Sequence, residues 1–476
     1  MKKIKQTISL IIAVTLIMVA CPDVTSAADL EIRKNLSVVV DGVSKGSIMA
    51  LDLNYDNNVY ISLRGLAYTL RETNSAFTPF VKESGIEIST GLDYYEDPHT
   101  WDAEELSERS KLKLARNDIS VNGVERRYYS LLGSLGESGM DAFMSPVHIA
   151  MILNTDIEIN NGEIVVNTGE PFSVSDADLE NSGYLQGVNS LVIGDGTTGE
   201  VYFNFDEDEV LPIASTTKLM TYLVMMDAVS DGKISLNDTV ILSSEAQRLS
   251  EGIDGVIAMT AGTEVPLKDL INGMLLASSN ECALAIAEHI AGSESAFVDM
   301  MNEKADELGL IDAKFYNCNG LPVYENQLLP AKMQNRMSAK EMFTLTSEIL
   351  NKYPQITDIT SVKIMSLPVF ERDIKNTNAI LYNLDEVKGL KTGTTNKSGA
   401  CLVSCAQVEK GGEIHNLVSV LLGAEGEYDR STVSEIAMRY AINKINGTVV
   451  ETEESYNSVP KNPELVVQKL IRNAMK

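Results

Sequence analysis

The spacing of apolar residues in the second half of the chain predicts both strands and helices. Apolar runs bounded by turn residues predict a hairpin over 191–203 and strands over about 400–407 and 415–423. Apolar residues three and four positions apart predict helices over about 215–229, 266–290, 296–308, 338–351 and 430–443. Strands at both ends with helices between them favour an α+β domain over 188–445, an antiparallel sheet flanked by helices.

Residues 28–170 carry a different pattern, which predicts a separate small α+β module. A strand and turn, a strand that runs into a short helix, and another strand are predicted in order, and a similar series follows. The first series covers 36–42, 59–70 and 85–90, and the second covers 119–123, 142–153 and 163–168. The module therefore has a weak internal repeat. The polar stretch 171–187 is expected to be a linker.

Residues 1–27 have the features of a secretory signal peptide. Three lysines precede an apolar run over 8–20, and small residues at 25–27 provide a cleavage site. The run is too short to span a bilayer as an ordinary helix. An alternative is lipidation at Cys21, because residues 18–21 resemble a lipoprotein box, although with Met in place of the usual Leu at its first position. The protein is expected to be secreted or held in the cell envelope, on the outer side of the cytoplasmic membrane.

The tail, 446–476, is acidic at first and favours an amphipathic helix at its end. Val467, Leu470, Ile471 and Ala474 would share one face of that helix. Peripheral contact with a membrane surface is therefore an expected property of the tail.

Composition narrows the classes of partner. The formal net charge is −28, and residues 1–27 contribute three lysines and one aspartate, which leaves about −30 for the rest. Nucleic acid is excluded as a partner, because nothing basic would neutralise its phosphates, and an anionic substrate would need local cations. The remaining cysteines and the scattered histidines match no metal motif, so neither a metal nor a cofactor is expected. The cysteines, expected to be small buried thiols, are Cys282, Cys318, Cys401 and Cys405.

Three short motifs occur in one order along the predicted α+β domain. They are Ser215-Thr-Thr-Lys218, Ser278-Ser-Asn280 and Lys391-Thr-Gly393, separated by 63 and 111 residues. A serine hydroxyl is a poor nucleophile until a base removes its proton, and Lys218, three residues on, could reach it from the same face of a helix. Lysine acts as a base only when its pKa is lowered, which burial and a second cation such as Lys391 would achieve. These motifs indicate acyl transfer on Ser215.

The other motif residues suit binding of a peptide. Ser278 would hydrogen-bond between the two lysines and relay a proton, and the amide of Asn280 would hold the substrate backbone. A strand carrying Lys391, Thr392 and Gly393 would pair with an extended peptide, and the glycine would keep the strand edge clear. The hydroxyls of Thr392 and Thr394 could bind a terminal carboxylate. The backbone N–H groups of Ser215 and Thr394 would form the oxyanion hole. Helix capping is the alternative role for Ser278 and Asn280.

Further segments extend this pattern to a known family. The segment 301–310, the turn Asn317-Cys-Asn-Gly-Leu321, and the segments 389–395 and 399–402 resemble the D-alanyl-D-alanine carboxypeptidases among the low-molecular-mass penicillin-binding proteins. The resemblance covers about 185–445. It implies a β-lactamase/transpeptidase-like fold and removal of D-alanine from peptidoglycan pentapeptides ending in D-Ala-D-Ala. It also implies acylation of Ser215 by β-lactam antibiotics, and a role for Arg430 at the substrate carboxylate, against the alternative of a surface arginine.

The flanking segments depart from that family. Many of its members carry a β-rich domain after the catalytic domain, whereas 31 residues follow position 445 here, so that domain is expected to be absent. The stretch from Tyr60 to Ala67 resembles the copper amine oxidase N-terminal-like domain, a stalk on secreted bacterial enzymes, although no copper ligands are evident. The module at 28–170 is therefore expected to act as a spacer or binding module.

Two alternative functions stay open. A class A β-lactamase would need a glutamate on a loop between the second and third motifs for deacylation, and no Glu-x-x-Leu-Asn pattern is found there. A non-catalytic peptidoglycan or penicillin binder would not need all three motifs intact. The decay rate of a penicillin adduct distinguishes these alternatives.

Overall fold

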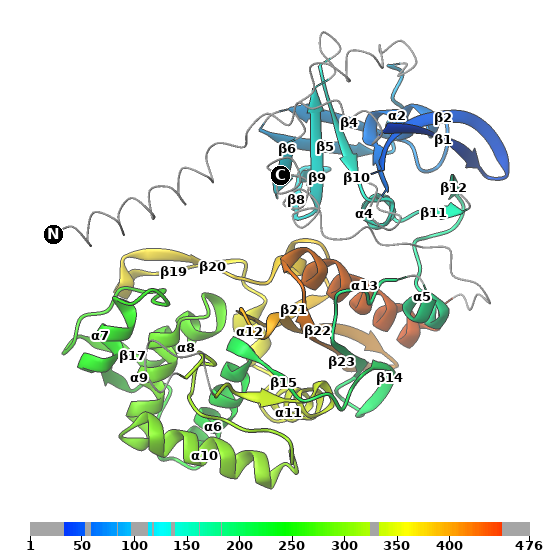
Figure 1. Cartoon of the computed structure of the whole chain (residues 1–476). Helices are drawn as coiled ribbons and strands as arrows, with labels where there is room; N and C mark the ends of the chain where they lie inside the picture. Colours follow the sequence, from blue (N-terminus) through cyan, green and yellow to red (C-terminus); the bar gives the residue numbers. More distant parts are fainter. Residues whose placement is uncertain are drawn as a thin grey trace, which may run out of the picture. The chain divides into compact units, whose positions relative to one another are not determined.

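The computed structural model describes residues 33–52, 59–82, 84–96, 113–116, 119–134, 139–160, 162–181, 183–323 and 333–449. These residues form two compact units that divide between Glu170 and Pro171 (Figure 1). The expected signal peptide, Cys21 and tail residues 450–476 lie outside the described residues.

The first unit is built mainly from strands. One sheet has the order β11-β12-β1-β2-β3-β10-β9-β6, and the other has the order β4-β5-β7-β8. The strands are β1 (Arg33–Val40), β2 (Val43–Asp52), β3 (Val59–Ser62), β4 (Phe77–Lys82), β5 (Gly85–Thr90), β6 (Lys113–Arg116), β7 (Ile119–Val121), β8 (Val124–Arg126), β9 (Tyr129–Ser134), β10 (Met140–Met144), β11 (Asp156–Asn160) and β12 (Glu163–Asn167), and the helices are α2 (Leu63–Thr69) and α4 (Pro146–Leu153).

The internal repeat predicted for this unit is confirmed, because the two series exchange strands reciprocally. The first strand of each series pairs in parallel with the last strand of the other, β1 with β12 and β7 with β5. The turns that follow β1 and β7 contain Asp41 and Asn122, both with positive φ. Each side chain accepts a hydrogen bond from the backbone of the opposite series, Asp41 from Thr168 at 2.8 Å and Asn122 from Thr90 at 2.9 Å.

The second unit combines one five-stranded sheet with a helical layer. Its strands are β13 (Ser190–Asp195), β14 (Glu200–Phe205), β15 (Leu211–Pro212), β16 (Thr239–Ile241), β17 (Glu264–Pro266), β18 (Arg336–Met337), β19 (Ile364–Leu367), β20 (Arg372–Lys375), β21 (Val387–Thr395), β22 (Gly399–Lys410) and β23 (Glu413–Ala424). Its α-helices are α5 (Asp176–Asn181), α6 (Lys218–Ser230), α7 (Ser244–Ser250), α8 (Leu267–Leu276), α9 (Asn280–Ala291), α10 (Glu294–Glu307), α11 (Ala339–Lys352), α12 (Ile356–Thr360) and α13 (Glu427–Asn446).

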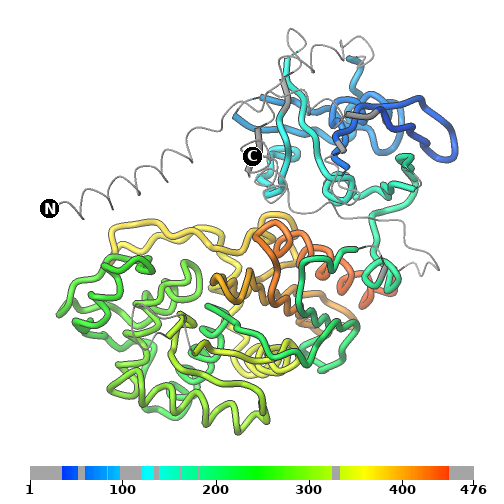
Figure 2. Tube along the Cα trace, viewed as in Figure 1, coloured from blue at the N-terminus to red at the C-terminus, as the bar shows by residue number. Residues whose placement is uncertain are grey.

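The large sheet joins the two ends of this unit. Its order is β14-β13-β23-β22-β21 with every neighbouring pair antiparallel, so the hairpin at the start of the unit lies beside the strands at its end (Figure 2). Helix α13 packs against β22 and β23, and α11 packs against β13 and β23. This architecture confirms the predicted α+β fold, an antiparallel sheet flanked by helices.

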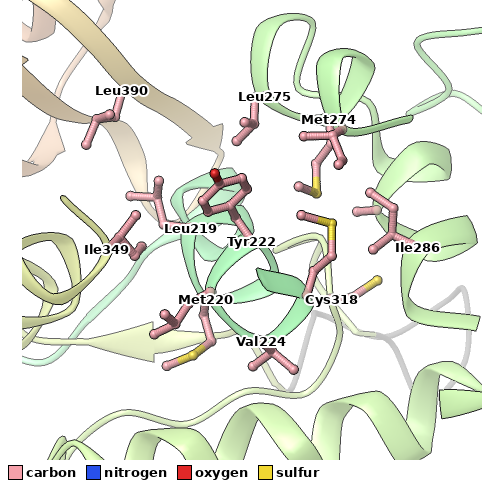
Figure 3. Close-up of a cluster of buried hydrophobic side chains, with 14 of the residues drawn as sticks. Leu219, Met220, Tyr222, Val224, Met274, Leu275, Ile286, Cys318, Ile349 and Leu390 are labelled. Atoms are coloured by element: carbon pink, nitrogen blue, oxygen red, sulfur yellow. The ribbon is translucent and has the colours of Figure 1, made fainter. Parts of the chain in front are cut away.

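Helix α6 is buried in the centre of the helical layer. Its side chains Leu219, Met220 and Tyr222 are at most 1% exposed, and they lie among apolar side chains of α8, α9, α11 and β21 (Figure 3). A helix that is apolar on every side is stable only when it is packed on every side. Truncating such a side chain to alanine typically costs about 2–5 kcal/mol. Packing of this strength fixes the position of Lys218, the first residue of α6.

The single helix predicted over 266–290 is wrong, because the chain breaks at 277–279. Ser278 adopts a left-handed conformation with φ of 60°, and the hydroxyl of Ser279 accepts a hydrogen bond from the N–H of Cys282 at 3.1 Å, which caps α9. The apolar periodicity runs on through α8 and α9, so the spacing of apolar residues does not mark the break. Competition from the serine side chain and tertiary contacts decide it.

The stretch 171–187 also differs from the linker predicted by its polar composition. It contains α5, and Phe172, Val174, Leu179 and Tyr184 are buried. Asp176 accepts hydrogen bonds from Tyr440 and Lys444 of α13, at 2.6 and 3.1 Å. This segment is therefore packed into the second unit.

In the part of the chain that the structure describes, none of the helices combines the length and the apolar character needed to cross a membrane. No group of three or more histidine, cysteine or acidic side chains within the described ranges is placed to hold a metal ion. Cys282, Cys318, Cys401 and Cys405 are free, buried thiols, as predicted.

Candidate active site

Ser215 lies in a tight turn that leads into α6. The turn is a 3₁₀-helix over Ala214–Thr217, so the α-helix predicted from residue 215 begins only at Lys218. In a 3₁₀-helix, side chains three positions apart are eclipsed. Ser215 and Lys218 are thereby aligned. Ala214 has a positive φ of 46°, a conformation that is rare and strained outside glycine.

The Lys218 amine is buried and makes three polar contacts. Its Nζ lies 2.9 Å from Oγ of Ser215, 2.8 Å from Oδ1 of Asn280 and 2.8 Å from the carbonyl oxygen of Asn319. The two carbonyl oxygens can only accept. A neutral amine has two N–H groups and one lone pair, so it can donate to both carbonyls and accept the proton of the Ser215 hydroxyl. Burial lowers the pKa of Lys218 to about 7.

The Asn319 carbonyl is held in place by the turn at 317–321. Gly320 has φ of +90°, and a Cβ there would lie 1.9 Å from the carbonyl oxygen of Ala214. Asn335 braces the turn by donating to the carbonyl of Asn317 at 2.8 Å and to the hydroxyl of Thr217 at 3.0 Å. From the sequence, this turn is recognisable only through the family resemblance. Asn335 was not predicted, because no motif marks it.

Of the residues in the second motif, Asn280 contacts the Lys218 amine and Ser278 does not. Asn280 is 5% exposed, and while its Oδ1 accepts from Lys218, its Nδ2 donates to the carbonyl of Asp254 at 2.9 Å. Ser278 is half-buried in the break between α8 and α9. Across the described ranges the Ser278 hydroxyl has no hydrogen-bond partner, so the expected bridge between the two lysines is not formed here.

Strand β21 carries the third motif directly alongside Ser215. Lys391 is 1% exposed, and its Nζ donates to the carbonyl of Thr392 at 2.9 Å. Burial, together with the charges of Lys218 and Arg430, places the pKa of Lys391 well below its usual value. A Cβ on Gly393 would lie 2.8 Å from the backbone nitrogen of Ser215. The glycine is therefore needed for the approach of β21 to the nucleophile, a reason that sequence reasoning did not identify.

Of the three residues expected at a substrate carboxylate, Arg430 and Thr394 contact each other, whereas Thr392 has another partner. Arg430 is 8% exposed and its Nη1 donates to Oγ1 of Thr394 at 2.9 Å, so these two side chains form a pair. The hydroxyl of Thr392 lies 2.5 Å from that of Thr377 and is engaged there. Arg430 thus brings a guanidinium next to Thr394 and close to the two buried amines, in a chain with a strongly negative balance.

The part of the sequence that forms this site matches one known family. Residues 186–426, just over half of the chain, match the sequence profile described as D-alanyl-D-alanine carboxypeptidase. The chain belongs to this family. The matched carboxypeptidase region contains all three motifs, whereas Arg430 lies just beyond it.

Individual relatives cover the same region. D-alanyl-D-alanine carboxypeptidase DacF of Bacillus subtilis is 34% identical over 246 residues, which is 51% of this chain and 59% of the relative. DacC of Escherichia coli is 30% identical over 248 residues, 51% of this chain and 58% of the relative. The chain thus spans less than two thirds of the length of either carboxypeptidase.

A solved structure agrees in fold. The crystal structure of a peptidoglycan synthesis regulatory factor (PBP3) from Streptococcus pneumoniae has a TM-score of 0.50 and 29% sequence identity. The similarity covers 54% of this chain and 72% of that chain.

Proposed function

We propose that this chain is a serine-type D-alanyl-D-alanine carboxypeptidase that trims peptidoglycan stem peptides through an acyl-enzyme on Ser215, and that penicillin acylates the same serine. The observation that carries the proposal is the buried Lys218 amine, 2.9 Å from Oγ of Ser215 and with a pKa of about 7. An amine with this pKa is neutral in a large fraction of molecules at neutral pH, so it can take the proton of the serine.

Acylation would begin when Lys218 accepts the hydroxyl proton and Ser215 Oγ attacks the carbonyl carbon of the penultimate D-alanine. The developing oxyanion would lie between the N–H groups of Ser215 and Thr394, and the close approach of Gly393, the neighbour of Thr394, to Ser215 supports this assignment. The leaving D-alanine needs a proton at its amine. Ser278, whose hydroxyl has no partner within the described residues, would pass that proton on from Lys218.

Substrate binding is assigned to β21, Asn280 and Arg430. An extended peptide would pair with β21, and the second N–H of the Asn280 side chain would hold its backbone, since the first is bound to Asp254. Arg430 and Thr394 would bind the terminal carboxylate as a pair. Lys391 would lie beside the bound peptide on β21, and Thr392, engaged with Thr377, supports the strand.

Purified protein treated with a labelled penicillin tests the function. Mass spectrometry is expected to place one adduct on the peptide that contains Ser215. The adduct should decay slowly, and the untreated protein should release D-alanine from a peptide ending in D-Ala-D-Ala. Rapid penicillin turnover without D-alanine release would favour the β-lactamase alternative. An adduct without any turnover would favour the non-catalytic binder.

The first unit is proposed to be a spacer or binding module, as its resemblance to a stalk domain suggests. A chain that starts at Pro171 keeps α5 and its contacts with α13, and it is expected to be acylated by penicillin within about twofold of the full-length rate, because Ser215 and its partners lie in the second unit. Its activity on intact cell wall is expected to fall. Loss of acylation in a folded truncated chain would show that the first unit completes the site.

A matched truncation at Leu185 sharpens this prediction. It removes Asp176 and the buried Phe172, so it is expected to lower the melting temperature relative to the Pro171 chain. Equal melting temperatures would contradict the packing of 171–187 into the second unit.

Secretion through residues 1–27, and a location in the cell envelope, are part of the proposal, because the substrate lies outside the cytoplasmic membrane. Lipidation at Cys21 is the alternative form of that export signal. The tail, 446–476, is proposed to contact the membrane surface peripherally. Binding of the protein, with and without the tail, to vesicles that contain anionic lipid would test this contact.

A further inference from the structure

Glu281 is a buried carboxylate that the proposed reaction does not use. It follows Asn280 in the first turn of α9 and is 0% exposed. Its Oε1 accepts hydrogen bonds from the backbone N–H groups of Val256, at 2.9 Å, and of Ile257. Within the described part of the chain, its Oε2 is buried without a hydrogen-bond partner. Acidic side chains are almost never fully buried without a specific reason.

The loop held by Glu281 belongs to the same hydrogen-bond chain as the nucleophile. Its residue Asp254 offers the carbonyl that fixes Nδ2 of Asn280 at 2.9 Å, and Oδ1 of Asn280 accepts from Lys218 at 2.8 Å. Lys218 in turn contacts Ser215. Arg372 of β20 braces the loop from outside through the carbonyl of Val256 at 2.7 Å. The orientation of the base therefore depends on this loop, and the position of the loop depends on Glu281.

We propose that Glu281 is a positioning residue for Lys218, which anchors the loop 254–257 behind Asn280 and places a carboxylate near the amine. The inference rests on the proposed function, because positioning of Lys218 has a consequence only if Lys218 activates Ser215. Loss of the loop anchor would change acylation through the position of Lys218. Loss of the carboxylate charge would change acylation through the pKa of Lys218.

The charge of Glu281 also acts on Lys218. Within the described residues, the titratable and charged groups around this pair are Cys282 of α9, Cys318 of the 317–321 turn with Glu294 of α10 bonded to it, Asp269 of α8, Arg372 of β20, and Lys391 of β21 with Arg430 of α13 acting on it. Burial raises the pKa of both the Cys282 and Cys318 thiols, so they stay neutral near neutral pH. Burial lowers the pKa of Lys218, and Cys318, Glu281 and Cys282 oppose that effect; with both thiols neutral, Glu281 is the group among these three whose charge acts near neutral pH.

Glu281→Gln separates charge from geometry, because the glutamine carbonyl can still accept from Val256 and Ile257. The rate of penicillin acylation would be measured over a pH series that brackets 7. The inflection of the Glu281→Gln profile is expected to move to lower pH by about one unit, since the neutral amine is favoured once the carboxylate charge is gone. The matched control is Glu288→Gln on the same helix, whose profile should coincide with that of the wild type.

Glu281→Ala removes the anchor as well. Its plateau rate at high pH is expected to fall about 10-fold or more, with Glu281→Gln retaining most of the wild-type plateau. Melting temperatures establish that each variant is folded, and the isosteric Glu281→Gln keeps the test decisive if Glu281→Ala does not fold.

Three results would overturn the inference. One is a Glu281→Gln inflection that coincides with those of the wild type and Glu288→Gln. Another is Glu281→Gln acylated normally but with its adduct no longer decaying, which would make Glu281 a base for deacylation. A wild-type protein that penicillin does not acylate would instead refute the proposed function itself, and the inference with it.

Discussion

Replacing Lys218 by methionine is expected to lower the rate of penicillin acylation by about 1,000-fold or more, because general-base catalysis contributes factors of about 10²–10⁴. Methionine is close to lysine in length and suits a site that is 0% exposed, so the fold should persist. The substitution leaves Ser215 in place but removes the group 2.9 Å from its hydroxyl.

The pH dependence of the wild type checks the same assignment. Burial holds the pKa of Lys218 near 7, below its usual value, so the fraction of neutral amine rises as the pH passes through 7. Acylation should rise with pH and reach a plateau above that inflection. The control is Lys233→Met, which changes an exposed lysine paired with Asp231. A flat profile, or a Lys218→Met protein as fast as the control, would refute Lys218 as the base.

Gly393→Ala is expected to lower acylation about 100-fold while the protein stays folded. The added Cβ would lie 2.8 Å from the nitrogen of Ser215 and 3.0 Å from both the carbonyl of Ile213 and the nitrogen of Thr216. These are backbone atoms that cannot rotate away, so the turn or the strand must shift. Overpacking of this kind typically costs about 1–3 kcal/mol, and a shift of about 1 Å at a reacting group can cost about 100-fold in rate.

The matched control is Gly169→Ala, where a Cβ would meet nothing within 4 Å. Acylation rates and melting temperatures of both variants would be compared with the wild type. If Gly393→Ala kept the wild-type rate, the close approach of β21 to Ser215 would not matter for the reaction. In that case the glycine would serve only to keep the strand edge clear for substrate.

The three motifs predicted that Ser215 and Lys218 meet, and that residues of the second and third motifs lie near them, but they did not predict each contact: the expected bridge by Ser278 is not formed. Lys218 contacts Ser215 and Asn280, and Gly393 lies against Ser215, although these residues are far apart in sequence. The strands predicted over about 400–407 and 415–423 correspond to β22 and β23, whose central residues are buried because α13 packs on both strands and α11 packs on β23. The order of the strands in the sheet was not predicted.

The elements predicted wrongly share a physical cause. The break at 277–279 and the packed segment at 171–187 carry local signals that long-range contacts override. The N–H of Ser279 donates to the carbonyl of Gly273, and the N–H of Thr377 donates to the carbonyl of Leu276. The second of these bonds joins residues about a hundred positions apart, and periodicity within a short window cannot register it.

The sequence by itself determined the chemical groups of the site and their order, because a nucleophile, an amine and an amide are properties of residue type. Only the tertiary structure decided what those groups can do. Burial of α6 among α8, α9 and α11 removes water from Lys218, and that desolvation brings the pKa of its amine to about 7. The same packing places the Asn319 carbonyl against the amine, and helix α9 holds Glu281 next to Asn280, which contacts that amine. The desolvation of a group and the electric field that acts on it depend on all the atoms around it in space. A short sequence motif therefore cannot specify the pKa of Lys218.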